Sequence, residues 1–206
     1  AVLDIVGHRA AAEVSADVGT SSLTRFSNSY IQQNVSAEVA SVTLRVARDG
    51  RVASATSTVT SPDVLHTFVG GTLDVAGQQP VDSDWRGVGG PFDQLPVDNW
   101  DESTAKAVPA ERAEADKAFV EAGVGLVAAG YCQTESRTQA FGNTAGRMAR
   151  GRYTTAVLVG IQQADGAAGS GHAAGASLAY IDAQSVGALA ADRARRSIEP
   201  FDAKPG

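Results

Sequence analysis

The feature that most constrains this chain is an internal repeat of a β-rich pattern. The first copy occupies residues 13–57, where short alternating segments flank the corner at 26–29, Phe-Ser-Asn-Ser. The second copy has a matching corner, Phe-Gly-Asn-Thr, at 141–144, and each copy runs on into a helix, near Ser61 and near Asp182. Both copies should build the same supersecondary unit. The sequence therefore predicts an α+β fold, a duplicated unit of mostly antiparallel strands followed by a helix.

A Pro- and Gly-rich connection and a long helix lie between the copies. The predicted organisation is a first repeat with its closing helix at 1–79, the connection at 80–108, the long helix with the second repeat at 109–199, and a linker at 200–206. The connection contains Trp85, Phe92 and Trp100. It is either a surface segment held by buried aromatic side chains, the interpretation we favour, or a substrate-binding loop.

The strands of the first copy are short in this prediction. They cover 12–18, 23–27, 30–35 and 38–47, with a turn at 19–22. In the last strand every second residue from Ala40 to Val46 is apolar, as expected of a sheet with one buried side. Asp49-Gly50 then favours a tight hairpin turn into a return strand at 52–58, because this pair tolerates positive φ.

The second copy repeats this order with a longer hairpin. Strands are predicted at 131–140, 148–154, 156–163 and 172–181. The segment 165–171, Asp-Gly-Ala-Ala-Gly-Ser-Gly, separates the last two strands and is predicted to be a flexible loop.

Helices are predicted from their caps and apolar spacing. They cover the last turns of a helix over 1–7, a helix from Ser61 to Gly77, one at 110–129 opened by Pro109 and stopped by Gly130, and one at 186–198 capped by Asp182. The Gly70-Gly71 pair costs about 1 kcal/mol per Gly relative to Ala. It implies either close packing against the sheet or a break in the helix.

Charge and cysteine content limit the partners of this chain. The net charge is −6 and no basic stripe is present, so we expect no nucleic-acid partner. With one cysteine, Cys132, no internal disulfide is possible, which favours a reducing, cytoplasmic setting. No apolar run is long enough for a membrane span, so we expect no membrane partner. The chain has no initiator Met and ends in Pro-Gly, and we interpret it as a piece of a longer protein.

The residues that could carry chemistry are scattered. His8, His66 and His172 form no His-Glu-x-x-His pattern, and a metal needs three or four converging ligands. Cys132 fits a small buried hydrophobe better than a nucleophile, although its reactivity stays open. The Gly-rich run at 166–171 lacks the Lys-Ser/Thr of a phosphate-binding loop, and the arginines of the last helix suit its C-terminal dipole. The sequence assigns no catalytic, cofactor-binding or metal-binding residue.

Two stretches resemble a known family. Residues 13–58, EVSADVGTSSLTRFSNSYIQQNVSAEVASVTLRVARDGRVASATST, and residues 130–158, GYCQTESRTQAFGNTAGRMARGRYTTAVL, look like the N-terminal domain of the TldD/PmbA family. The resemblance runs from about Leu3 to Glu199 and is a diffuse pattern of strands and corners. The family's proteins were once called modulators of DNA gyrase and are cytosolic metallopeptidases.

The resemblance implies a scaffold without the catalytic centre. In the family the N-terminal domain is a duplicated α+β unit, and zinc is held by a C-terminal domain with a His-Glu-x-x-x-His helix and a distant Cys. That motif is absent here, so no catalytic residue carries over and we expect no zinc and no peptidase activity in this chain. Zinc is expected in a C-terminal domain if the parent protein is active.

The expected role is the N-terminal scaffold and dimerisation domain of a peptidase that degrades unfolded peptides. Homodimers or heterodimers with a related subunit and a peptide substrate are the implied partners. The alternative is a non-catalytic PmbA-like partner subunit, or a stand-alone peptide-binding or assembly module. Strands with open edges suit all of these roles, since they accept an extended peptide by strand addition.

Overall fold

The computed structural model describes residues 1–92, 97–164 and 166–198. The predicted linker at 200–206 and part of the connection therefore lie outside the described residues. Helices and strands follow in the order α1 (Val2–Val6), β1 (Ala11–Ser27), β2 (Tyr30–Arg48), β3 (Arg51–Ser57), α2 (Pro62–Gln78), β4 (Val97–Asn99), α3 (Glu102–Ala105), α4 (Pro109–Glu121), β5 (Val127–Asn143), β6 (Met148–Ala164), β7 (Ala167–Gly175), the 3-10 helix η1 (Leu178–Tyr180) and α5 (Ala183–Arg196). The element order confirms the predicted α+β class and its duplicated pattern of a long hairpin, a return strand and a helix.

The strands form one mostly antiparallel sheet in the order β3-β2-β1-β5-β6-β4, with β7 also paired to β6. The chain divides into two compact units. The first unit comprises 1–19, 38–98 and 137–152, and the second comprises 20–37, 99–136 and the chain from Tyr153 on. The tip of each long hairpin thus belongs to the unit that contains the closing helix of the other repeat.

The long strands correct the short ones predicted from the sequence. The turn predicted at 19–22 is wrong, because β1 runs unbroken through these residues. Their hydroxyls bond across the sheet instead: Ser21 Oγ donates to Glu135 Oε1 at 3.0 Å, and Ser22 Oγ lies 2.8 Å from Ser36 Oγ. In isolation, small hydroxyl residues favour a turn. Here their side chains are hydrogen-bonded to side chains on neighbouring strands instead.

The two matching corners are both hairpin turns, but they differ in detail. Asn28 and Ser29 have φ of 52° and 64° and form the turn between β1 and β2. In the second copy the Asn143 side chain accepts hydrogen bonds from the backbone N–H of Ala145 and Arg147, at 3.0 and 2.9 Å. The Asp49-Gly50 turn is confirmed, with φ of 52° and 72°.

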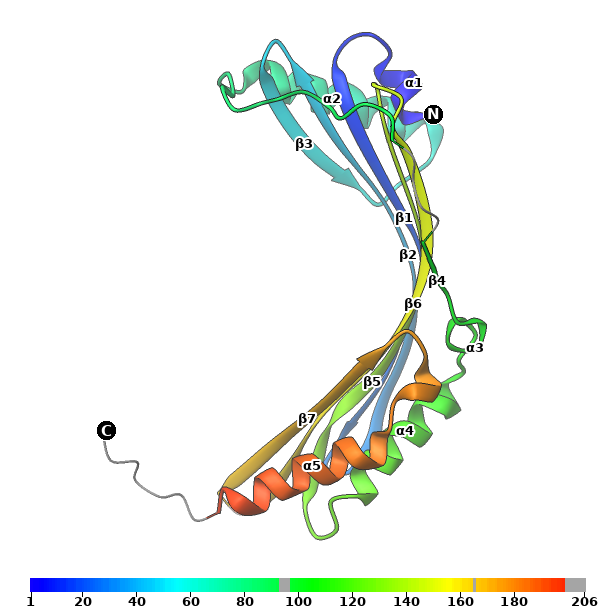
Figure 1. The fold of residues 1–206 in the computed structure, drawn as a ribbon, viewed down its shortest axis with the longest axis vertical. Helices are drawn as coiled ribbons and strands as arrows, with labels where there is room; N and C mark the ends of the chain where they lie inside the picture. Colours follow the sequence, from blue (N-terminus) through cyan, green and yellow to red (C-terminus); the bar gives the residue numbers. More distant parts are fainter. Residues whose placement is uncertain (93–96, 165, 199–206) are drawn as a thin grey trace, which may run out of the picture. The chain divides into compact units, whose positions relative to one another are not determined.

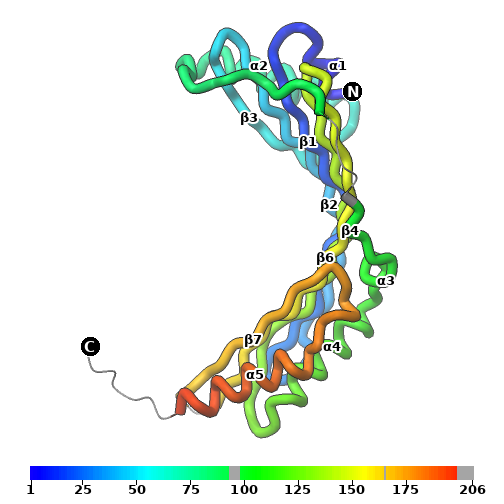
Figure 2. Tube along the Cα trace, in the orientation of Figure 1, coloured from blue at the N-terminus to red at the C-terminus, as the bar shows by residue number. Residues whose placement is uncertain are grey.

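The Gly-rich segment predicted as a loop is a strand from Ala167 on. In β7, Ala167 pairs with Ala164 and Gly171 with Gly160, and the trace in Figure 2 shows β7 returning along β6 before the chain enters α5. A Cβ on Gly169 would lie 2.1 Å from the carbonyl oxygen of Ala190. The glycines therefore serve the close approach of α5 to β7.

The long helix is shorter than predicted. It ends at Glu121 rather than at residue 129, and β5 begins at Val127. Gly125, with a φ of 78°, lies in the turn that joins α4 to β5. Gly130, predicted as the helix stop, lies within β5, where a Cβ would come within 2.2 Å of the carbonyl oxygen of Val159. Close packing, rather than a cap, explains this glycine.

The other predicted helices are confirmed with shifted bounds. Asp182 caps α5 through Ser185 N–H at 3.0 Å, and Gly7 ends α1 with a φ of 58°. Gly70 and Gly71 neither break α2 nor approach a neighbour, since nothing lies within 4 Å of a Cβ built on either. The glycine pair therefore marks neither close packing against the sheet nor a break in the helix.

The first unit packs α2 against the sheet. Figure 1 shows α1 and α2 together on one side of its strands. The apolar face predicted for residues 40–46 faces this core, where Val42, Leu44 and Val46 are buried with Val69 and Leu73 of α2.

Trp85 and Phe92 of the connection contact arginines, whereas Trp100 Nε1 donates to Glu102 Oε2 at 2.8 Å. The Arg45 guanidinium lies 4.6 Å from the Trp85 ring centroid, and Arg147 lies 4.6 Å from that of Phe92. Phe92 is 50% exposed, so it does not hold the segment by burial. The described part of the connection is a surface segment stabilised by cation–π contacts and also contains β4 and α3.

The second unit places α4 and α5 side by side on one face of its strands (Figure 1). Its core joins Phe26 of β1, Phe119 of α4 and Leu158 of β6. The rings of Phe26 and Phe119 are 5.6 Å apart. No helix among the described residues is long and apolar enough to cross a membrane.

Candidate docking site at an open strand edge

The first part of β2 has an open edge in the second unit. β3 pairs with β2 only from Val42 to Arg48, and the other neighbour of β2 is β1. Within the described parts of the chain, no strand is paired with the outer edge of Tyr30–Ala37. Edge strands are usually protected by charge or by proline, and residues 26–37 contain neither. The unpaired backbone groups of this edge are available to another extended chain.

An apolar groove runs beside this edge. Its volume is about 520 Å³, and it lies between the β1–β2 turn and the face of α4. Tyr30 and Ile31, which are 73% and 49% exposed, line one side. Ala113 and Val120 of α4 line the other side. We call this cavity the β2 groove. Open edges next to apolar pockets recognise both the backbone and the side chains of an extended peptide.

A buried arginine anchors α4 beneath the groove. Arg112 is 1% exposed. Its guanidinium donates to Thr24 Oγ1 and Asn34 Oδ1 at 3.3 Å each, to Thr134 Oγ1 at 3.2 Å and to the carbonyl oxygen of Ala107 at 2.9 Å. These partners come from β1, β2, β5 and the segment before α4. Arg112 therefore fixes the helix against the strand that carries the open edge.

Asp116 lies one turn further along α4 and also lines the groove. It is 0% exposed, and neither carboxyl oxygen has a hydrogen-bond partner among the described residues. Burial raises the pKa of Asp116 to about 8, because removal from water disfavours the carboxylate, and the charge of Arg112 only partly offsets this effect. At neutral pH the side chain is therefore mostly protonated.

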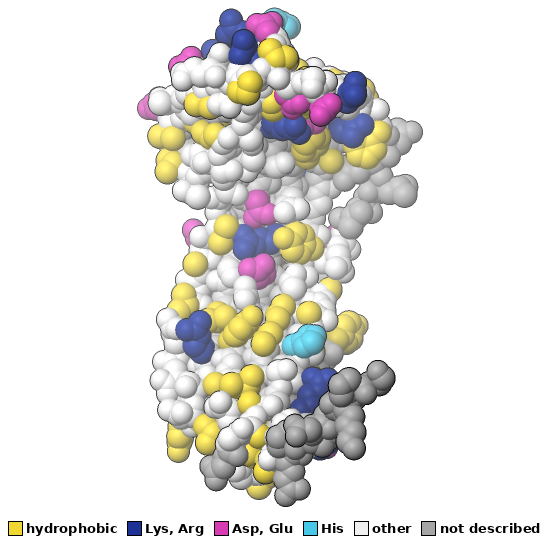
Figure 3. Space-filling view, turned by 90° about the vertical axis from the view of Figure 1, so that its left-hand side faces the viewer, with side chains coloured by type: hydrophobic (Ala, Val, Ile, Leu, Met, Phe, Trp, Pro, Cys, Tyr) yellow, Lys and Arg dark blue, Asp and Glu magenta, His cyan; other side chains and the backbone are white. Residues whose placement is uncertain are grey.

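The opposite face of this unit's sheet is not covered by its helices. In β6, Ala156, Leu158 and Gly160 alternate toward α4 and α5, while Val157 and Val159 face the other way and are half-buried. Figure 3 shows this side of the molecule, where charged side chains are sparse over the second unit. The uncovered face offers a broad surface of low charge.

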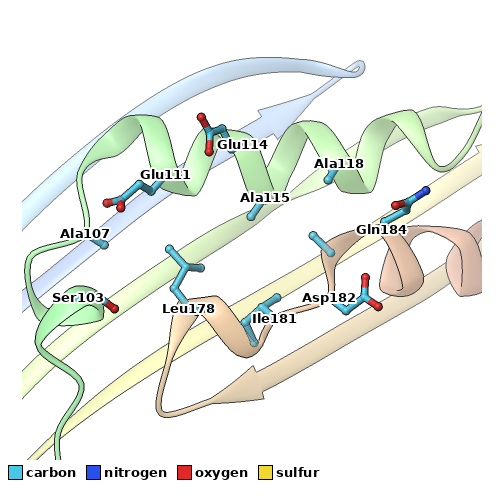
Figure 4. Close-up of a pocket in the computed structure, with 12 residues that line it drawn as sticks. Ser103, Ala107, Glu111, Glu114, Ala115, Ala118, Leu178, Ile181, Asp182 and Gln184 are labelled. Atoms are coloured by element: carbon cyan, nitrogen blue, oxygen red, sulfur yellow. The ribbon is translucent and has the colours of Figure 1, made fainter.

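A second depression, of about 430 Å³, lies between α4 and the start of α5 (Figure 4). Glu111 and Asp182 are at its rim, but both already serve as helix caps. Glu111 Oε2 accepts from Val108 N–H at 2.7 Å, and Asp182 Oδ2 accepts from Ser185 Oγ at 2.6 Å. These carboxylates are explained by helix capping.

The histidines and Cys132 do not form a site. Across residues 1–92, 97–164 and 166–198, no three His, Cys, Asp or Glu side chains are grouped as a metal centre requires. Burial raises the pKa of the Cys132 thiol to about 12, and the neighbouring Asp116 adds to this effect. A thiol in this environment is a poor nucleophile and a poor zinc ligand. The ligand types and positions among the described residues therefore do not fit a zinc ion, which the family resemblance places in a C-terminal domain.

The arginines at the end of α5, predicted only to suit the helix dipole, have partners within the second unit. Arg193 donates to the carbonyl oxygen of Ser170 at 2.7 Å, and Arg195 to that of Val124 at 3.0 Å. Arg196 lies 3.5 Å from Asp192.

Arg112, Asp116 and the position of the open edge were not predicted from the sequence. One signal was present: Arg112, Asp116 and Phe119 are spaced four and three residues apart, so they share one helical face with an apolar residue. The uncharged run at 26–37 was a second signal, since a free edge is normally charged.

Comparisons with known proteins agree with this architecture. Residues 12–69 match the family model for PmbA/TldA metallopeptidase domain 1. No match was found among curated proteins. The fold is similar to three solved structures, each under 20% identical in sequence.

A Bacteroides thetaiotaomicron protein described as a modulator of DNA gyrase superposes with a TM-score of 0.83 at 16% identity, over 95% of this chain and 48% of that protein. TldE from Thermococcus kodakarensis gives 0.74 at 13%, over 90% and 44%. A Thermotoga maritima protein, described as a modulator of a DNA gyrase, gives 0.71 at 14%, over 94% and 46%. The chain thus spans a little under half the length of these proteins.

The family match covers the first long hairpin, β3 and the start of α2, and the three structures share the fold of nearly the whole chain. These findings agree with the resemblance seen in the sequence: residues 12–69 match the first domain of the PmbA/TldA metallopeptidases, and nearly the whole chain has the fold of part of these three proteins.

Proposed function

We propose that this chain is the non-catalytic scaffold of a TldD/PmbA-type peptidase that degrades unfolded peptides in the cytoplasm. The observation that carries the proposal is the open, uncharged edge of β2 beside the β2 groove. Such an edge can pair with an extended segment, either a peptide or the same edge of a second subunit. The uncovered sheet face of the second unit would serve as a wall of low charge along which an unfolded peptide lies.

Homodimerisation is the form of assembly that can be tested with this chain alone. Two copies can pair their β2 edges antiparallel around a two-fold axis, and residues 26–37 bring no like charges together. A related subunit with the same fold could take the place of the second copy. Zinc and the hydrolytic step would then come from residues outside this chain.

Lysines on the edge should weaken self-association. We expect the double substitution Ile31→Lys and Val35→Lys to raise the dimer dissociation constant at least about tenfold, because two facing edges would then carry like charges. Light scattering over a concentration series measures this constant. The control is Val64→Lys, at a 37% exposed position on α2. A wild-type chain that stays monomeric at about millimolar concentration would contradict homodimerisation through this edge.

The isolated chain should hydrolyse no peptide. We expect less than about 0.1 zinc per chain by elemental analysis, and no cleavage of casein or short peptides, because the described residues offer no group of three metal ligands. Stoichiometric zinc together with cleavage that a chelator abolishes would refute this expectation.

A stand-alone peptide-binding or assembly module is the second candidate. The same lack of a grouped ligand set favours it. A His-Glu-x-x-x-His segment encoded downstream of residue 206 would identify an active peptidase subunit, whereas its absence would favour a PmbA-like partner or a non-enzyme.

A further inference from the structure

The carboxyl group of Asp116 needs an explanation. Nearly all buried polar groups in folded proteins are hydrogen-bonded. Asp116 is fully buried, yet both of its carboxyl oxygens lack a partner among the described residues. It also lines the β2 groove, between the apolar side chains of Ala113 and Val120. An apolar groove with one unsatisfied polar group at its floor is typical of a binding site.

The neighbours of Asp116 leave its acceptor capacity free. Arg112 is the nearest cation on the same face of α4, but its donors are directed at Thr24, Asn34, Thr134 and the carbonyl oxygen of Ala107. No hydrogen bond joins Arg112 to Asp116 in the described structure. Both oxygens are shielded from solvent in the free chain, so a donor supplied by an occupant of the groove would pair with them once the Asp116 side chain turns toward the groove.

The rim of the groove favours a positively charged donor. Glu114, Lys117 and Glu121 are its exposed charged residues. Lys117 lies 3.6 Å from Glu121 and is largely compensated by it, so Glu114 gives the rim an acidic excess. An incoming lysine or arginine would meet attraction at the rim and a carboxyl group at the floor.

The open edge orients such an occupant. A strand added to Tyr30–Ala37 would direct every second side chain toward the face that carries α4, because strand side chains alternate. These side chains would enter the β2 groove beside Tyr30 and Ile31. Backbone pairing would supply affinity, and the groove would select the side chain.

We propose that the β2 groove binds an extended peptide segment by strand addition and selects a lysine or arginine side chain, whose charged group pairs with the Asp116 carboxylate while the carboxyl proton is released to solvent. The inference rests on the proposed function, in that the β2 edge must accept an extended chain. It adds the chemical class of the segment.

Two labelled peptides of about seven residues test the selectivity. One is Thr-Val-Thr-Lys-Thr-Val-Thr, and the other has norleucine in place of lysine; both carry fluorescein and neutral ends. Fluorescence anisotropy with the 206-residue chain measures both dissociation constants. We expect the lysine peptide to bind at least about tenfold more tightly.

Variants assign the preference to Asp116. Asp116→Asn should remove the preference by weakening binding of the lysine peptide, and circular dichroism should show that the variant is folded. Glu114→Gln, at the rim, should retain most of the preference. Equal affinities of the wild type for both peptides would overturn the inference and leave the docking edge intact. A preference that survives in Asp116→Asn would also overturn it. Binding of neither peptide would overturn both the inference and the docking function.

Discussion

Replacing Asp116 by Asn should remove a large part of the pH dependence of this chain's stability. The pKa of Asp116 is raised from 3.8 to about 8 in the folded state. The folded state therefore holds this proton more tightly than the unfolded state does. The contribution of Asp116 to stability is fully present below about pH 4, declines as the pH rises toward 8, and is constant above that.

The expected slope is at most about 1.4 kcal/mol per pH unit. Over the whole interval, Asp116→Asn should gain about 3–5 kcal/mol relative to the wild type, because a buried carboxylate without a partner no longer forms. Urea unfolding at a series of pH values measures the difference. The control is Asp74→Asn at an exposed position of α2, which should change stability by less than about 0.5 kcal/mol. A difference between Asp116→Asn and wild type that does not vary with pH would show that Asp116 is ionised in the folded state.

Gly169→Ala should displace α5 from β7. A Cβ at this position would lie 2.1 Å from the carbonyl oxygen of Ala190 and 2.4 Å from the backbone nitrogen of Ala194. Because both are backbone atoms of one helix, a rotamer change cannot relieve the clash, and the helix must move. We expect a loss of about 3 kcal/mol and a fall in Tm of about 6–12 °C, measured by calorimetry.

The matched control is Gly70→Ala in α2, where nothing lies within 4 Å of the added Cβ. This substitution should stabilise the chain by about 1 kcal/mol, through helix propensity alone. If both variants lowered Tm equally, the destabilisation would not come from the contact between α5 and β7.

Local chemistry in the sequence predicted the fold class, the hairpin turns at Asn28-Ser29 and Asp49-Gly50, and most helix starts. The Asp49-Gly50 turn and the Asp182 cap each depend on residues that are close in the sequence, and both are confirmed. The strand lengths were wrong because Ser21 and Ser22 are satisfied by Glu135 and Ser36, which are distant in the sequence. A pattern read along one strand cannot show such partners.

The glycines were misread for the same reason. Gly130, Gly169 and Gly171 have the composition of caps and loops, yet they lie in strands that another element approaches closely. The β2 groove likewise could not be predicted from the sequence. It is formed by the tip of one hairpin together with one side of α4, and these two segments are distant in the sequence. By contrast, the scatter of the histidines was visible in the sequence itself.

Hydrogen–deuterium exchange at Tyr30–Ala37 tests the central claim most directly. In the free chain, the amides that point away from β1 should exchange quickly, because no described strand covers that edge. With a saturating amount of the lysine peptide, exchange at 30–37 should slow at least about tenfold, while exchange at the edges β3 and β7 should not change. Unchanged exchange at 30–37 under conditions where anisotropy shows the peptide bound, or protection confined to β3 or β7, would contradict docking at this edge.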